Sequence, residues 1–220
     1  MNPPLVVIKL GGSLARSPLL ARWLALLARQ PADRARLVVP GGGPFADAVR
    51  LLEPDLGLDA GTAHRCAILA MQQYGLMLAS RAPGLSLVED ELDVARLRLR
   101  AGAGVWLPWR MAGRSPELPA SWDVTSDSIA AWLAARLRAR ALLVVKRAEA
   151  GGCLTALVRR GVLDPAFAAF ARAVPRVRVV PAEPLPDPDT LAELTGPLQA
   201  GPPPSPSPPA SPPGASFGRS

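Results

Sequence analysis

Short apolar runs recur along the chain with helix-like stretches between them, and this alternation constrains the fold more than any other feature. The runs have the length and aliphatic content of strands that are buried on both faces of a sheet. Strands that alternate with helices pack as layers around a mainly parallel sheet. The sequence therefore predicts an α/β protein with a three-layer αβα sandwich. The expected strands are residues 5–10, 37–39, 85–88, 104–108, 141–146 and 176–180.

The stretches between these runs carry helix signals. Ser17 and Pro18 open one helix, and Thr125 or Ser126 opens another, because these residue types favour helix N-termini. Apolar residues at spacings of three and four predict that both helices bury one side. Three more helices are expected within residues 45–52, 62–81 and 90–100. The alternating pattern of residues 176–180 predicts a strand at the edge of the sheet.

Composition limits the domain organisation and the compartment. We expect one folded domain over residues 1–200 and a disordered Pro/Ser-rich tail over residues 201–220, because such a tail cannot bury a core. The chain has two cysteines and one histidine, without metal-site spacing, so no metal site is predicted. No signal peptide or run of roughly 20 apolar residues is seen, which predicts a cytoplasmic protein without a membrane partner.

Positive charge is abundant but scattered. The formal net charge is +7, and the arginines are spread along helical stretches without interleaved aromatic residues. This distribution argues against a nucleic-acid partner and suits a small phosphorylated ligand. Of the 25 basic residues only Lys9 and Lys146 are lysines. Both lie near the ends of predicted strands, where a buried ammonium group needs an anionic partner, and a phosphate is suitable.

Two glycine-rich loops follow predicted strands. Gly11, Gly12 and Ser13 come directly after the first strand, and the three glycines 41–43 follow the second. Without side chains, their amide groups can approach an anion closely. The loops match neither the Walker A pattern nor the dinucleotide fingerprint. Parallel sheets bind their ligands beyond the carboxyl ends of the strands, where both loops lie. Both loops are therefore expected in one site.

Asp127 is the carboxylate that stands out. It lies at the start of a predicted helix, where an acidic residue is also favoured by the helix dipole alone. The functional alternative is that Asp127 holds the two lysines in place while they bind phosphate oxygens.

The quoted motifs resemble those of the amino acid kinase family. The stretches VIKLGGSL, VVPGGGPFAD, WDVTSDSIAAWLA and LLVVKRAEAGG occur in the family's order. The third of these and VWLPWR also resemble the archaeal kinases of methanofuran biosynthesis and their relatives in methylotrophic bacteria. The resemblance implies ATP-dependent transfer of the γ-phosphoryl group, with Mg²⁺, to a small phosphorylated alcohol in one-carbon cofactor biosynthesis. It also implies self-association as a homo-oligomer.

The same resemblance implies roles for individual residues. Lys9 would stabilise the transferring group, Asp127 would orient the lysines, and Lys146 would lie near the nucleotide phosphates. The first glycine loop, Gly11, Gly12 and Ser13, would bind the ATP phosphates. The second loop, Gly41, Gly42 and Gly43, would hold the acceptor.

Two tryptophans and an arginine suggest a further substrate contact. Trp106 and Trp109 flank a proline after a predicted strand, and they are either core residues or a flat wall for a ring-shaped acceptor. Arg110 would then bind a substrate phosphate.

The chain departs from the family in one turn, where a usually acidic motif reads RAEAGG. This keeps open the alternative of a weakly catalytic or non-catalytic binding protein. A second alternative, independent of this turn, is a kinase for another acceptor such as a carboxylate or a nucleoside monophosphate.

Overall fold

The computed structural model describes residues 3–29, 33–147 and 150–196. Its centre is a six-stranded sheet in the order β3-β4-β2-β1-β5-β6, and every neighbouring pair is parallel. The predicted α/β sandwich is confirmed. The strands are β1 Leu5–Leu10, β2 Ala35–Pro40, β3 Ser86–Val88, β4 Ala103–Trp106, β5 Ala141–Lys146 and β6 Val177–Pro181.

Helices cover both faces of this sheet because alternate residues of each strand point to opposite sides. On β1, Leu5 and Val7 join one apolar cluster with α4, α6, α7 and α8. Val6 and Ile8 join the other cluster with α1 and α9, and α3 contributes to both. These helices are α1 Leu19–Ala28, α3 Ala60–Ser80, α4 Glu91–Leu99, α6 Ser126–Arg136, α7 Leu154–Arg159, α8 Phe167–Ala171 and α9 Pro188–Thr195.

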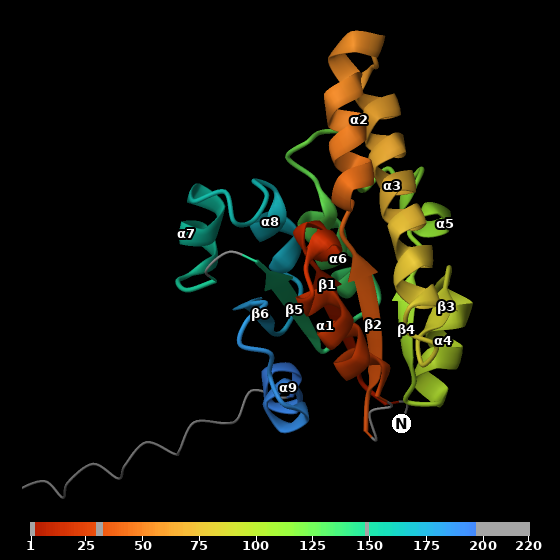
Figure 1. The fold of residues 1–220 in the computed structure, drawn as a ribbon, viewed down its shortest axis with the longest axis vertical. Helices are drawn as coiled ribbons and strands as arrows, with labels where there is room; N and C mark the ends of the chain where they lie inside the picture. Colours follow the sequence, from red (N-terminus) through yellow and green to blue (C-terminus); the bar gives the residue numbers. More distant parts are fainter. Residues whose placement is uncertain (1–2, 30–32, 148–149, 197–220) are drawn as a thin grey trace, which may run out of the picture.

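Helices α2 (Gly43–Leu56) and α3 form a pair that projects beyond the carboxyl ends of the strands (Figure 1). Helix α2 was expected to end near residue 52, but it continues through Pro54 to Leu56 and is capped by Gly57, which has the left-handed φ of +59°. Its side chains are half-buried or exposed, and none is fully buried. Helix α2 therefore borders the space above the sheet without adding to the core, whereas α3 does both.

Other predicted boundaries are close to those observed. Strand β6 lies at the sheet edge, as its alternation indicated. The short helices η1 (Gly12–Arg16) and α5 (Trp109–Ala112), and helices α7 to α9, were not predicted. The predicted tail, residues 201–220, lies outside the described residues. Within the described ranges, none of the helices combines the length and apolar character needed to cross a bilayer.

Candidate active site

Strand geometry brings the two lysines to one face of the sheet. Lys9 of β1 is in register with Val144 of β5, so Lys146 lies two residues further along the neighbouring strand. Residues two apart on a strand point to the same side. Lys9 is 3% exposed, and the side chain of Lys146 is 16% exposed. Both ammonium groups thus reach the carboxyl end of the sheet beneath α6.

Asp127 lies between these two ammonium groups. It is in the first turn of α6 and is buried, with 3% of its surface exposed. Its Oδ1 lies 2.7 Å from Lys9 Nζ, and its Oδ2 accepts a hydrogen bond from Lys146 Nζ. One carboxylate therefore bridges the two lysines, which is the arrangement expected from the sequence.

The charges of this trio do not cancel. Burial alone would raise the pKa of Asp127, but Lys9 and Lys146 together hold that pKa below its ordinary value. Burial, aided by repulsion from Lys9, lowers the pKa of Lys146, while Asp127 opposes this shift. With both lysines protonated and the aspartate ionised, these three residues carry one surplus positive charge, and the nearby Asp164 carboxylate also favours the charged form of Lys146. A desolvated surplus charge favours an incoming anion.

A second carboxylate, Asp164, fixes the segment that carries Asp127. Its Oδ2 accepts from the Thr125 amide at 2.9 Å, the Thr125 hydroxyl at 2.7 Å and the Ser128 amide at 3.2 Å. Its Oδ1 accepts from Ser128 Oγ at 2.5 Å. Asp164 is only 8% exposed, so it serves as a buried N-terminal cap for α6. Sequence reasoning missed Asp164 because it lies 36 residues from Ser128 along the chain.

The two glycine loops touch through their main chains. A Cβ on Gly12 would lie 2.4 Å from the Gly43 nitrogen, and a Cβ on Gly41 would lie 2.3 Å from the Gly12 nitrogen. Either side chain would force the loops apart. Gly43 also has a φ of +55°, which other residues rarely adopt. Close approach and backbone conformation thus explain these glycines.

Not every glycine of the predicted loops faces the open space. The Gly11 amide already donates to the Val145 carbonyl at 3.1 Å, and Gly41 is buried against Gly12. The others, together with Ser13, line a cavity above the sheet. Of the first-loop amides that were expected to bind an anion, only those of Gly12 and Ser13 remain as candidates.

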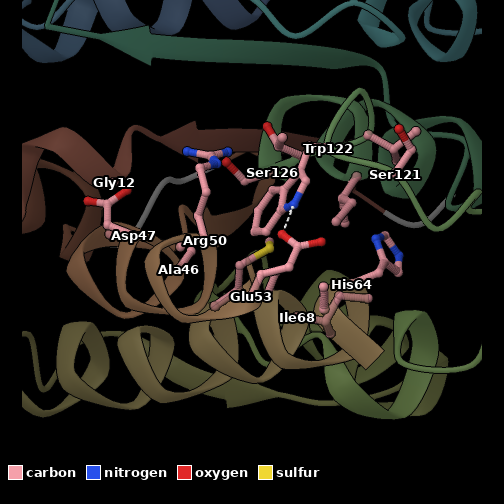
Figure 2. Close-up of a pocket in the computed structure, with 18 of the residues that line it drawn as sticks. Gly12, Ala46, Asp47, Arg50, Glu53, His64, Ile68, Ser121, Trp122 and Ser126 are labelled. Atoms are coloured by element: carbon pink, nitrogen blue, oxygen red, sulfur yellow. Dashed lines mark hydrogen bonds between the residues drawn. The ribbon is translucent and has the colours of Figure 1, made fainter. Parts of the chain in front are cut away.

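This cavity has a volume of about 250 Å³ and is enclosed by the second glycine loop, α2, α3 and the segment before α6 (Figure 2). Ser126 lines it one residue before Asp127, so the lysine–aspartate trio lies beside it. The α3 side contributes small residues at helical spacing, namely Ala60, Ala63 and Ala67, and these leave the space open. The cavity is slightly smaller than the roughly 300–1,000 Å³ of a typical ligand pocket.

Comparison with known proteins identifies the family. Residues 4–150, about two thirds of the chain, match the family model described as "Amino acid kinase family". The chain belongs to the amino acid kinase family. The resemblance seen in the sequence is thereby confirmed.

Individual proteins resemble this chain in sequence or in fold. The [5-(aminomethyl)furan-3-yl]methyl phosphate kinase of Methanocaldococcus jannaschii is 28% identical over 141 residues, which cover 63% of each chain. The present chain thus spans less than two thirds of that relative. Uridylate kinase from Archaeoglobus fulgidus is a structural neighbour with a TM-score of 0.61 and 20% identity over 90% of this chain and 97% of that one. UMP kinase from Ureaplasma parvum is another structural neighbour, with a TM-score of 0.63 and 13% identity over 87% of this chain and 94% of that one. These structural likenesses concern the fold alone.

Several cavity residues of this amino acid kinase family member were not predicted. Trp122 Nε1 donates to Glu53 Oε2 at 2.5 Å, and the Arg50 guanidinium lies 4.3 Å from the centroid of the Trp122 ring. His64 also lines the cavity. Trp122 is the first residue of the stretch WDVTSDSIAAWLA, in which Asp127 was singled out and the tryptophan was not. Arg50 and Glu53 lie on one helix at a spacing of three. Charged residues at this spacing also occur on solvent-exposed helix surfaces, so the sequence alone did not mark them as cavity residues.

Trp109 and Arg110, predicted to bind the acceptor, are placed elsewhere. The Trp109 amide donates to Gln72 Oε1 at 3.0 Å, and Arg110 lies within 3.2 Å of Asp90 and 3.5 Å of Glu89. Neither lines the cavity beside the trio. Both belong to α5, a short helix after β4 with its own neighbours, so they lie outside this cavity and their contact with a substrate stays a prediction.

Trp106 resolves the alternative left open by the sequence. It is fully buried, and its ring centroid lies 6.4 Å from that of Trp132. It is thus a core residue.

Proposed function

We propose that this protein is an ATP-dependent kinase that transfers the γ-phosphoryl group to the phosphate of a small phosphorylated alcohol in one-carbon cofactor biosynthesis. The observation that carries the proposal is the buried trio of Lys9, Asp127 and Lys146, with its surplus positive charge, beside two glycine loops. Membership of the amino acid kinase family and a curated relative named as a phosphate kinase support the same reaction.

The trio is suited to phosphoryl transfer because this reaction needs alignment and charge neutralisation more than covalent help from the protein. An oxygen of the acceptor phosphate attacks the γ-phosphorus while the bond to the β–γ bridging oxygen breaks, and that electron pair leaves with ADP. Lys9 would neutralise charge on the group in transit, and Lys146 would bind nucleotide phosphate oxygens. Asp127 would keep both ammonium groups charged and oriented.

The nucleotide and its metal fit the residues present. Gly12 and Ser13 present main-chain groups beside the trio, and the surplus positive charge suits the phosphates of ATP. Within the described ranges, no three histidine, cysteine or acidic side chains gather as a metal site. Mg²⁺, which supplies further charge neutralisation when bound, would thus be held mainly by phosphate oxygens.

The cavity supports a small acceptor. Its volume of about 250 Å³ is modest, and its glycine-lined end lies next to Ser126 and thus close to the trio. Arg50, in place of Arg110, would bind the acceptor phosphate. A nucleoside monophosphate, one of the alternatives, would need room for a base and a ribose as well as the phosphate.

The experiment is an ADP-release assay with Mg-ATP and a panel of acceptors. The panel contains [5-(aminomethyl)furan-3-yl]methyl phosphate, the same compound with methyl in place of aminomethyl, UMP and N-acetylglutamate. We expect ADP formation above the ATP-only background with the furan phosphates and their conversion to diphosphates. Tight binding of these compounds without ADP would instead support the non-catalytic binding protein.

A further inference from the structure

The far end of the cavity from the glycine loops gathers hydrogen-bond acceptors. Glu53 uses Oε2 to accept from the Trp122 indole, and its second oxygen has no partner within the described part of the chain. The carboxylate is half-buried, so this free oxygen is partly removed from water. A carboxylate in such a position favours a ligand that donates hydrogen bonds.

His64 adds a second unsatisfied group at this end. Its Nε2 is buried and has no hydrogen-bond partner among the described residues. Burial lowers the pKa of His64, so the ring is neutral at physiological pH and one of its nitrogens is an acceptor. Figure 2 shows the Glu53 carboxylate and the His64 ring on the same side of Trp122.

The charged side chains of the cavity lie at different points along its length. Arg50 lies on the Gly12 side of Trp122, against the indole ring, and Asp47 lies beside Gly12 at that same end (Figure 2). No ion pair joins Glu53 to Arg50 or to any other cation of the described chain. The negative charge of Glu53 at the far end therefore lacks a counter-ion from the protein.

We propose that Glu53 and His64 form a subsite for a protonated primary amine on the acceptor. An ammonium group offers three donors and a positive charge, which match the free Glu53 oxygen and a neutral His64 nitrogen. A second phosphate or a carboxylate at this end would be repelled by Glu53. The acceptor class is thus a small phosphate monoester with an amine at its opposite end. This inference rests on the proposed function, because it takes the cavity to be the acceptor site.

The test is equilibrium binding without nucleotide, measured by titration calorimetry. The probes are [5-(aminomethyl)furan-3-yl]methyl phosphate and its analogue with methyl in place of aminomethyl. We expect the amine to bind about 10- to 100-fold more tightly, the range for a hydrogen bond to a charged group. In the Glu53→Gln variant this preference should largely vanish, while the affinity for the methyl analogue stays within a few-fold.

Two further variants separate the carboxylate from its surroundings. Asp55→Asn removes the same charge from an exposed position of α2, outside the cavity, and should keep the preference for the amine. Trp122→Phe removes the indole donor but leaves Glu53, and it should also keep the preference. Equal binding of the two probes by the unmodified protein would overturn the proposal, as would no binding of either probe or an unchanged preference in Glu53→Gln. Loss of the preference in Trp122→Phe as complete as in Glu53→Gln would assign recognition to the ring and overturn the role of Glu53.

Failure of the subsite and failure of the kinase differ in their readouts. ADP release with the methyl analogue at the same efficiency as with the amine leaves the kinase standing and removes the amine subsite. Glu53-dependent binding of the amine without ADP release keeps the subsite and removes the kinase.

Discussion

Replacing Asp127 by asparagine would remove the carboxylate that pairs directly with both buried ammonium groups. In the folded protein Lys9 and Asp127 are each 3% exposed, and the Lys9 Nζ to Asp127 Oδ1 distance is 2.7 Å. Breaking a buried ion pair by removing one partner costs about 3–5 kcal/mol, because the remaining charge stays desolvated. We therefore expect the Asp127→Asn variant to lose about that much free energy of unfolding at pH 7.

The loss should shrink as the pH rises. Asp127 opposes the lowering of the Lys146 pKa, so without it burial and repulsion from Lys9 hold that pKa further below the value in the unfolded chain, about 10.4. The unfolded chain then holds more protons than the folded one, so the stability of the variant rises with pH relative to the parent protein. Urea unfolding of the variant and the parent at pH 7 and pH 9.5 measures this difference in stability. The comparison holds when the slope of unfolding free energy against urea concentration is the same for both proteins.

Two comparisons make the result decisive. Asp123→Asn changes an exposed aspartate in the same segment and should cost well under about 1 kcal/mol. Adding Lys9→Met to Asp127→Asn removes one unpaired charge and should recover part of the loss, as a double-mutant cycle would show. A loss in Asp127→Asn no larger than that in Asp123→Asn would refute the buried trio.

The remaining predictions concern the same site. Lys9→Ala should lower kcat by about 10²–10³ in the ADP assay, and unchanged turnover would remove Lys9 from the mechanism. Since burial lowers the pKa of Lys146, the activity should fall on the alkaline side below the ordinary lysine range, and Lys146→Arg should shift that limb to higher pH in a pH–rate profile. Gly12→Ala places a Cβ 2.4 Å from the Gly43 nitrogen and should destabilise the protein by about 1–3 kcal/mol in thermal unfolding. Gly151→Ala, where nothing lies within 4 Å, is the matched control, and an equal effect of both would contradict the contact between the loops.

The sequence predicted the strands and the central trio because both depend on local signals. Lysines at the ends of apolar strands, with Asp127 at a helix start, could be recognised without tertiary information. Parallel strands then bring their carboxyl ends together. The roles of these residues in catalysis stay predictions.

The residues of the cavity proposed for the acceptor could not be predicted in the same way. Trp109 and Arg110 carried an attractive local pattern, yet their placement depends on how α5 packs after β4. Glu53 and Trp122 meet across 69 positions of the chain, and Asp164 reaches Ser128 across 36. Such long-range pairs have no sequence periodicity and are set only when the layers assemble.

The alanines that α3 presents to the cavity have a consequence for the diversification of such enzymes. Ala60, Ala63 and Ala67 stand on a projecting helix, whereas the lysines stand on central strands. Enlarging or exchanging one of these methyl groups would reshape the cavity proposed for the acceptor, while the lysine–aspartate trio on the strands and α6 would stay in place. A few substitutions on the cavity-facing side of α3 would thus let a lineage change its acceptor, if the proposed site is right, while the residues of the trio are kept.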